Sequence, residues 1–95
     1  MKRFLLLHVG FETPTPEIMQ AWRRWFESAA SRTGENAGLR NGREISKSGV
    51  RDLEMGPDAL TGYTIINAED MSEAEAIARE NPFITAIRIY ELATH

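Results

Sequence analysis

The chain has no cysteine, and this absence removes several kinds of chemistry at once. Disulfide bonds, a thiol nucleophile and a thiolate metal site are all excluded. The only imidazoles belong to His8 and His95, and the carboxylates lack the spacing of a metal-ligand set. A phosphate-binding glycine loop and a nucleophile triad are missing as well. We therefore expect no metal and no other cofactor, and a cytoplasmic location.

Long apolar runs are also missing, since no run approaches the ~20 residues that cross a bilayer. Basic residues precede apolar ones in 1–7, but the apolar run stops at His8 and no small-residue cleavage site follows. We read this start as a strand. The 95 residues, 42% hydrophobic and 26% charged, suit one compact soluble domain over 1–95 without a membrane partner.

The net charge of −3 hides an asymmetry between the two halves of the chain. Residues 1–51 carry a net charge of +4, and residues 52–95 carry −7. Such halves can attract each other or a second subunit. Neither half shows a basic helix or aromatic-rich basic strands, so we expect no nucleic-acid partner.

The first half of the chain predicts a strand and then a helix. Residues 3–9 are a short apolar run of strand length. Thr15 can cap a helix that runs from Pro16 to Ser31. The apolar residues of this segment recur at helical spacing, at Ile18, Trp22, Trp25, Phe26 and Ala29. Trp22, Trp25 and Phe26 are expected in the core, with a pocket wall as the alternative role for one of the tryptophans.

The middle of the chain contains the Asn41-Gly42 pair, which is typical of a two-residue hairpin turn. A turn there joins strands within 39–45 and places Arg40 opposite Arg43. Glycine and proline then predict a loop through residues 46–61.

The second half repeats the order strand, helix, strand. Residues Tyr63 to Ala68 are β-branched and aromatic, as in strands. Ser72 and Glu75 match a capping box that starts a helix from Ser72 to Glu80, before Pro82. The last strand is expected from Ile84 to Leu92.

This order predicts an α+β fold of ferredoxin-like βαββαβ type, with a four-stranded antiparallel sheet and an extra hairpin in the middle. Two helices then cover one face of the sheet. The first strand is apolar on both sides, with Leu5 and Leu7 opposite Phe4 and Leu6. An apolar bare face needs a cover. We therefore expect a homodimer through the sheet face.

Five segments together resemble the YCII-related domain family: KRFLLLHVGFE, TPEIMQAWRRWFES, LRNGREIS, GPDALTGYTII and EAEAIARENPF. The resemblance covers nearly the whole chain and implies a dimeric ferredoxin-like α+β barrel. It also implies a cleft in which a histidine and an aspartate cooperate. The chain departs from the family in its first helix, where Trp22 and Trp25 stand and some relatives have a histidine. It also has Met55-Gly56-Pro57-Asp58 in place of Asp-Gly-Pro-Phe.

Two residues are candidates for a catalytic role, His8 for proton transfer and Asp52 as its orienting partner. His8 has a side chain whose ordinary pKa lies near neutrality, and it falls on the side of Phe4 and Leu6. The alternative is a histidine that only packs at a strand end. Asp52 can orient the imidazole. Its alternative is a turn or an ion pair with Arg51.

Substrate binding is assigned to Arg40, Arg51 and Trp22. The two arginines belong to a basic stretch that can hold a carboxylate or phosphate, although a solvated hairpin edge explains the charges equally well. Trp22 can form a pocket wall. Two functions stay open: an enzyme that uses His8 for acid/base chemistry on a small polar or anionic metabolite, or a non-catalytic dimeric module that binds a ligand or another protein.

Overall fold

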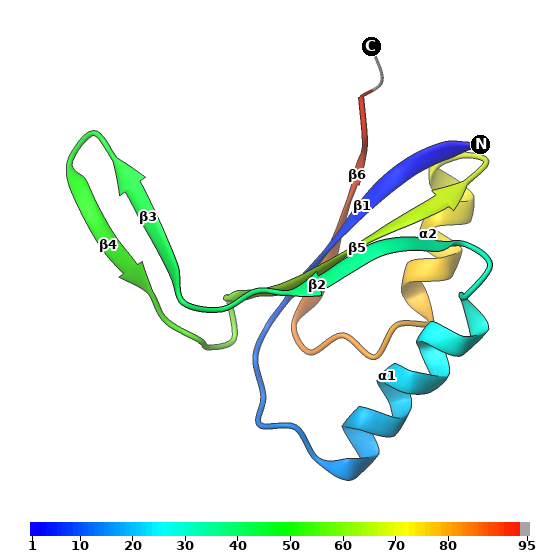
Figure 1. Cartoon of the computed structure of the whole chain (residues 1–95), viewed down its shortest axis with the longest axis horizontal. Helices are drawn as coiled ribbons and strands as arrows, with labels where there is room; N and C mark the ends of the chain where they lie inside the picture. The colour runs from blue at the N-terminus through cyan, green and yellow to red at the C-terminus, as the bar shows by residue number, and fades with distance from the viewer. Residues whose placement is uncertain (94–95) are drawn as a thin grey trace.

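The computed structural model describes residues 1–93, and in this range the chain forms an α+β fold (Figure 1). His95 lies outside the described residues. The elements in chain order are β1 (Lys2–Val9), α1 (Pro16–Ser28), β2 (Thr33–Gly38), β3 (Gly42–Ser46), β4 (Gly49–Leu53), β5 (Leu60–Ala68), α2 (Met71–Arg79) and β6 (Ala86–Glu91).

The main sheet has the strand order β2-β5-β1-β6, and every neighbouring pair is antiparallel. Strands β3 and β4 form a separate two-stranded sheet. Both helices lie on the same side of the main sheet (Figure 1). This is the ferredoxin-like arrangement with an extra hairpin in the middle, so the predicted fold class is confirmed. Within residues 1–93, no helix is long and apolar enough to span a membrane.

The core lies between the main sheet and the two helices. Its buried members are Phe4, Leu6, Trp25, Ala29, Ile66, Ala68, Ala74 and Ala78. The small side chains come largely from α2 and the end of β5, so this helix can approach the sheet closely, while the aromatic bulk comes from α1 and β1. The predicted core role of Trp25 is confirmed, since 3% of its surface is exposed.

Helix α1 begins at the predicted cap, whereas α2 begins at a different residue from the one predicted. Thr15 Oγ1 accepts a hydrogen bond from the backbone N–H of Ile18 at 3.2 Å, as expected of an N-cap. For α2 the predicted cap was wrong. Asp70 is the N-cap and accepts from the N–H of Glu73 at 2.9 Å, so Ser72 lies inside the helix. An aspartate caps as well as a serine, and here it comes two residues earlier.

The predicted turn at Asn41-Gly42 was also wrong. Asn41 has a φ of 56° and forms the corner at which the chain leaves the main sheet between β2 and β3. The hairpin turn lies at residues 47–48, because Ser46 pairs with Gly49 in the register of β3 and β4. Asn41 therefore does adopt the left-handed backbone conformation, but it does so where the chain leaves the sheet and not in a hairpin turn. Residues 49–53, predicted as loop, form β4.

This register changes the environment of the hairpin arginines. Arg43 lies opposite Asp52, and Arg51 lies opposite Glu44. Each pair forms an ion pair, at 3.2 Å between Arg43 Nε and Asp52 Oδ1 and at 2.9 Å between Arg51 Nε and Glu44 Oε2. Contrary to the prediction, Arg40 and Arg43 do not lie opposite each other. Residues of opposite charge pair across the hairpin instead.

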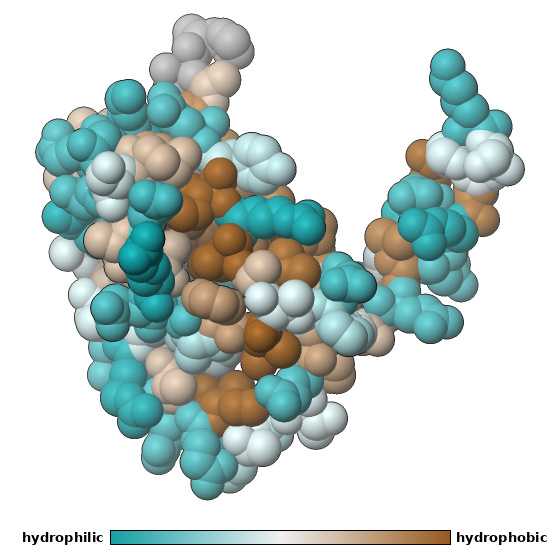
Figure 2. Space-filling view, turned by 180° about the vertical axis from the view of Figure 1, so that it is seen from behind, coloured by the Kyte–Doolittle hydropathy of each residue, from teal (hydrophilic) through white to brown (hydrophobic). Residues whose placement is uncertain are grey.

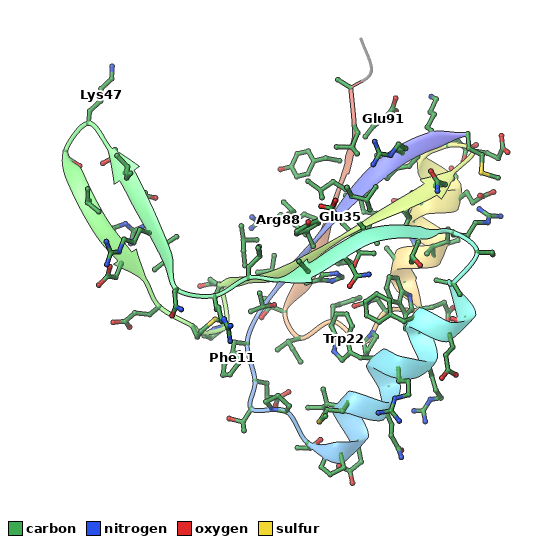
Figure 3. The ribbon with its side chains drawn as sticks, viewed as in Figure 1. Phe11, Trp22, Glu35, Lys47, Arg88 and Glu91 are labelled. Atoms are coloured by element: carbon green, nitrogen blue, oxygen red, sulfur yellow. The ribbon has the colours of Figure 1, made fainter. Side chains whose placement is uncertain are left out.

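The sheet face away from the helices, which we call the open face, is partly apolar. Leu5 and Leu7 are half-buried there, and Leu7 lies opposite Tyr63. Glu35 accepts a hydrogen bond from the Tyr63 hydroxyl, which raises the pKa of Tyr63. Figure 3 shows Glu35 and Arg88 on this side of the sheet and Trp22 on the helix side. The β3–β4 hairpin projects from the body as a separate arm (Figure 2).

Candidate functional site

His8 lies near the end of β1, a central strand of the main sheet. Alternation along the strand turns its side chain to the helix side, after Phe4 and Leu6. Its neighbours in register are Gly62 on β5 and Ile87 on β6. Only 5% of His8 is exposed, so the ring belongs to the interior. The strand prediction therefore placed His8 on the correct face.

One ring nitrogen of His8 is paired and the other is not. Nε2 is 2.9 Å from Thr64 Oγ1, and both residues are buried. Nδ1 is buried and has no hydrogen-bond partner among residues 1–93. A buried N–H without a partner is rarer in proteins than a buried acceptor without one. This favours the tautomer in which Nε2–H donates to Thr64 and Nδ1 carries a free lone pair.

Tryptophan rings surround the His8 imidazole. The Trp22 ring lies 5.0 Å from it, centroid to centroid, and the Trp25 ring lies 6.4 Å away, both in edge-on orientation. Burial lowers the pKa of His8 from 6.5 to about 4, because the charged imidazolium loses its hydration there. At neutral pH the ring is therefore uncharged and can accept a proton but has none to give from Nδ1.

A hollow of about 350 Å³ lies next to this cluster. Its wall includes Trp22, whose ring also contacts the imidazole, and does not include His8 itself. Thr61, also in the wall, donates through its hydroxyl to the carbonyls of His8 and Gly10, at 3.3 and 3.1 Å. Gly10 has a φ of 112°, and a Cβ there would lie 2.8 Å from the backbone nitrogen of Thr85. Glycine is thus required where the strand ends at the hollow.

A third buried polar side chain, Asn81, was not predicted from the sequence. It is 4% exposed, and its Oδ1 and Nδ2 both lack a partner among residues 1–93. Asn81 follows α2 and stands four residues after Ile77, whose carbonyl accepts from Trp25 Nε1 at 3.0 Å. Trp25 therefore contacts both the His8 ring and the end of α2. The sequence did offer a signal for this buried position: the polar Asn81 stands directly before Pro82 and follows the apolar face of a helix.

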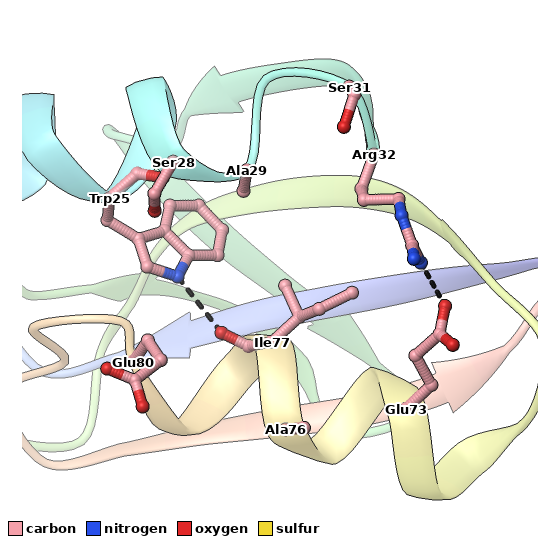
Figure 4. Close-up of a pocket in the computed structure, with 9 residues that line it drawn as sticks. All are labelled: Trp25, Ser28, Ala29, Ser31, Arg32, Glu73, Ala76, Ile77 and Glu80. Atoms are coloured by element: carbon pink, nitrogen blue, oxygen red, sulfur yellow. Dashed lines mark hydrogen bonds and ion pairs between the residues drawn. The ribbon is translucent and has the colours of Figure 1, made fainter.

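Another hollow, of about 390 Å³, lies between α1 and α2. Figure 4 shows two polar contacts across it: Trp25 Nε1 with the Ile77 carbonyl, and Arg32 with Glu73. These contacts tie the helices and the start of β2 together. We interpret this hollow as structural.

The other three predicted site residues lie together at the base of the hairpin. Arg40, Arg51 and Asp52 line a hollow of about 760 Å³ there. Asp52 and Arg51 are engaged in the ion pairs with Arg43 and Glu44, and the bond to Arg51 lowers the pKa of Glu44. Arg40 forms no ion pair with any residue in 1–93. The structure thus brings His8 and Trp22 together, and it groups Arg40, Arg51 and Asp52 elsewhere.

The sequence matches no family model and no curated protein sequence. The structure is similar to that of 5-chloro-2-hydroxyhydroquinone dehydrochlorinase from Burkholderia phenoliruptrix AC1100, solved in complex with 2,5-dihydroxybenzoquinone. The TM-score is 0.59 at 12% identity, and the match covers 98% of this chain and 95% of that chain. A likeness at this identity shows a shared fold. The chain therefore has a ferredoxin-like α+β fold that it shares with an enzyme of nearly the same extent.

Proposed function

We propose that the protein is a small enzyme in which His8 accepts a proton from a substrate bound beside Trp22. The observation that supports this most is the buried, unpaired Nδ1 of a neutral His8. A buried polar atom without a partner costs about 1–3 kcal/mol. A substrate hydroxyl that donates to Nδ1 supplies the missing partner, so binding relieves a cost that the free protein carries.

The walls of the hollow beside His8 indicate the kind of substrate. They are mainly apolar, with Phe11, Ile18, Trp22 and Ile84 among them, and they carry one charge of each sign, at Arg23 and Glu12. Such a surface suits a small flat ring that carries hydroxyl or carbonyl groups. The enzyme of similar fold was solved with a dihydroxybenzoquinone. A hydroxylated ring also fits the broader class of small polar or anionic metabolites, and membership of the YCII-related family is part of this proposal.

The proton transfer uses groups of this chain alone. The substrate O–H bond breaks, a new N–H bond forms at Nδ1, and the electron pair stays on the substrate oxygen. Thr64 keeps the ring in orientation through Nε2–H, while Trp22 and Trp25 exclude water. The oxyanion beside the imidazolium compensates the desolvation that lowers the pKa of free His8. Because His8 does not line the hollow, the Trp22 indole has to rotate for a substrate hydroxyl to reach Nδ1.

This proposal gives no direct part in the proton transfer to Asp52, Arg40 or Arg51. Within the protomer, Thr64 performs the orienting role that was predicted for Asp52. Arg40 stays a candidate for anion binding, because it is the cation of this group without an ion pair in residues 1–93. Arg51 binds an anion only if it releases Glu44.

The test is a solvent-exchange assay on hydroquinones, whose hydroxyls are protonated at neutral pH, in which proton NMR follows the loss of ring C–H signals in D2O. The ring protons of such compounds exchange through the oxyanion that His8 would generate. We expect His8→Gln, which keeps a donor for Thr64 and loses the base, to reduce the catalysed exchange by ~10²–10⁴-fold. Arg24→Gln, at an exposed position of α1, is the control. Exchange by His8→Gln at the wild-type rate would refute the proposal.

A non-catalytic dimeric module is the second candidate, and the open face favours it. Leu5, Leu7 and Tyr90 leave apolar surface there, and 56% of Tyr90 is exposed. We propose that two copies pair through this face. Sedimentation as a monomer at micromolar concentration would contradict the pairing. Two results together would favour the module over the enzyme. The calorimetric Kd for a ring compound would be the same in wild type and His8→Gln, and the protein would not catalyse exchange of the ring protons.

A further inference from the structure

We propose that the β3–β4 hairpin is an arm that packs on a second copy of this chain and completes the dimer interface. The arm consists of residues 42–53. This inference rests on the proposed pairing of open faces, and it adds a contact that the four-stranded sheet does not itself provide.

The arm has no support from its own protomer. Its strands form a sheet separate from the main one, and every residue of both strands is exposed. Ile45 and Val50 lie directly opposite each other and are 81% and 63% exposed. A lone two-stranded hairpin is at best marginally stable in water. An apolar cross-strand pair on such a hairpin indicates a surface that another molecule covers.

The arm stands on the side where a second copy would dock. It leaves the main sheet after β2 and rises away from the two helices (Figure 1). Lys47 marks its tip, and Arg88 and Glu35 point from the open face into the space on the same side (Figure 3). Figure 2 shows this space as an open gap between the arm and the body. A molecule that covers the open face is therefore within reach of the arm.

The arm enlarges the surface that the protomer offers to a second copy. Four strands ~4.8 Å apart and ~25 Å long give the open face a flat footprint of roughly 500 Å². One face of the arm, two strands of five residues, adds roughly 170 Å². The arm therefore increases the footprint by about a third.

Symmetry favours a second copy over an unrelated partner. The arm and the open face lie on the same side, so one two-fold axis gives both copies the same set of contacts. Charge is nearly balanced on both surfaces, since the arm carries three basic and two acidic residues, β5 carries no charged residue and β6 carries Arg88 and Glu91. Neither surface therefore strongly repels a second copy.

The main test measures dimer dissociation by analytical ultracentrifugation in the full chain carrying Ile45→Lys and Val50→Lys. Both side chains are exposed in the protomer, so the double variant should fold, and we expect its Kd for dimerisation to rise at least tenfold. Met71→Glu, a partly exposed apolar position at the start of α2, serves as the matched control and should leave the Kd unchanged. An unchanged Kd in the double variant overturns the role of the arm.

Leu7→Asp on the open face separates the two proposals. A dimer that Leu7→Asp dissociates and the arm variant leaves intact keeps the face pairing and removes the arm. Hydrogen exchange gives a second readout on the unmodified protein. We expect the amides of residues 42–53 to be protected in the dimer and to lose that protection on dilution to monomer. Equally fast exchange of these amides in dimer and monomer overturns the inference.

Discussion

At the scale of single residues, His8 is set apart by a combination of burial and an incomplete set of hydrogen bonds. Thr64 pairs with Nε2, two indoles surround the ring, and Nδ1 is left without a partner in residues 1–93. A histidine that served packing alone would be expected to have both nitrogens satisfied. The unpaired nitrogen is therefore the reason to assign it a function.

The lowered pKa of His8 predicts a pH dependence of stability. The unfolded chain binds the His8 proton with a pKa of 6.5, and the native protein binds it only near 4. The free energy of unfolding should therefore be highest above pH 6.5, fall as the pH decreases from 6.5 to about 4, and level off below. The His8 contribution to this fall is at most about 3 kcal/mol. Urea unfolding between pH 4 and 8 measures it.

The matched variant for this prediction is His8→Gln, which does not titrate and still offers Thr64 a donor. The difference in unfolding free energy between wild type and variant should change with pH only in the window from 6.5 to about 4. Parallel curves for the two proteins over that window would show that the imidazole ionises freely in the native state.

The sequence predicted part of this site. Strand alternation correctly turned His8 toward the helices, and helical spacing placed Trp22 on the face that meets it. Thr64 and Asn81 were not predicted, because their positions depend on which strands pair and on where α2 ends. Asp52 was grouped with His8 by residue type, and its ion pair with Arg43 follows from a hairpin register that the sequence did not reveal.

At the scale of elements, apolar strands were easier to predict than polar ones. β1 and β5 are apolar or β-branched, and they were recognised. β2 reads TGENAG and has no apolar alternation, so it went unrecognised. It is a strand because β5 offers it a free edge, and its pairing is irregular between Thr33 and Asn36. Tertiary pairing decides such a segment where local preference does not.

The cap of α2 gives a prediction at this scale. Asp70→Ala removes the acceptor for the N–H of Glu73 and should lower the free energy of unfolding by about 1 kcal/mol. Ser72→Ala alters a residue inside the helix and should change it by less than about 0.5 kcal/mol. Chemical denaturation of both variants compares them directly. A larger loss of unfolding free energy in Ser72→Ala than in Asp70→Ala would show that Ser72, and not Asp70, caps the helix.

At the scale of the whole molecule, the protomer is broad and thin, with extents of 41, 40 and 18 Å. One side of the sheet carries both helices, while the other side carries the open face and the arm. A protomer of this shape exposes apolar groups at Ile45, Val50 and Tyr90 that a monomer would leave in water. Pairing of two copies would give both sides of the sheet a cover.

Dimerisation predicts a dependence of thermal stability on protein concentration. Because association stabilises the native state by mass action, the Tm should rise with each tenfold increase in concentration above the dimer Kd. Differential scanning calorimetry from ~1 to ~100 μM, a range of about two orders of magnitude, measures this shift. A Tm that is constant across the range would contradict the dimer.

The central claim is that the free lone pair of His8 Nδ1 meets the substrate, and the most direct measurement is the ¹⁵N NMR spectrum of the His8 ring at neutral pH. In the free protein, Nε2 should appear protonated and Nδ1 unprotonated. Saturation with a hydroquinone, whose hydroxyls are protonated at neutral pH, followed independently by tryptophan fluorescence, should move the Nδ1 resonance toward the protonated position and leave Nε2 protonated. Nitrogen resonances that stay unchanged at saturation, in a protein whose fluorescence reports a filled hollow, would contradict the claim.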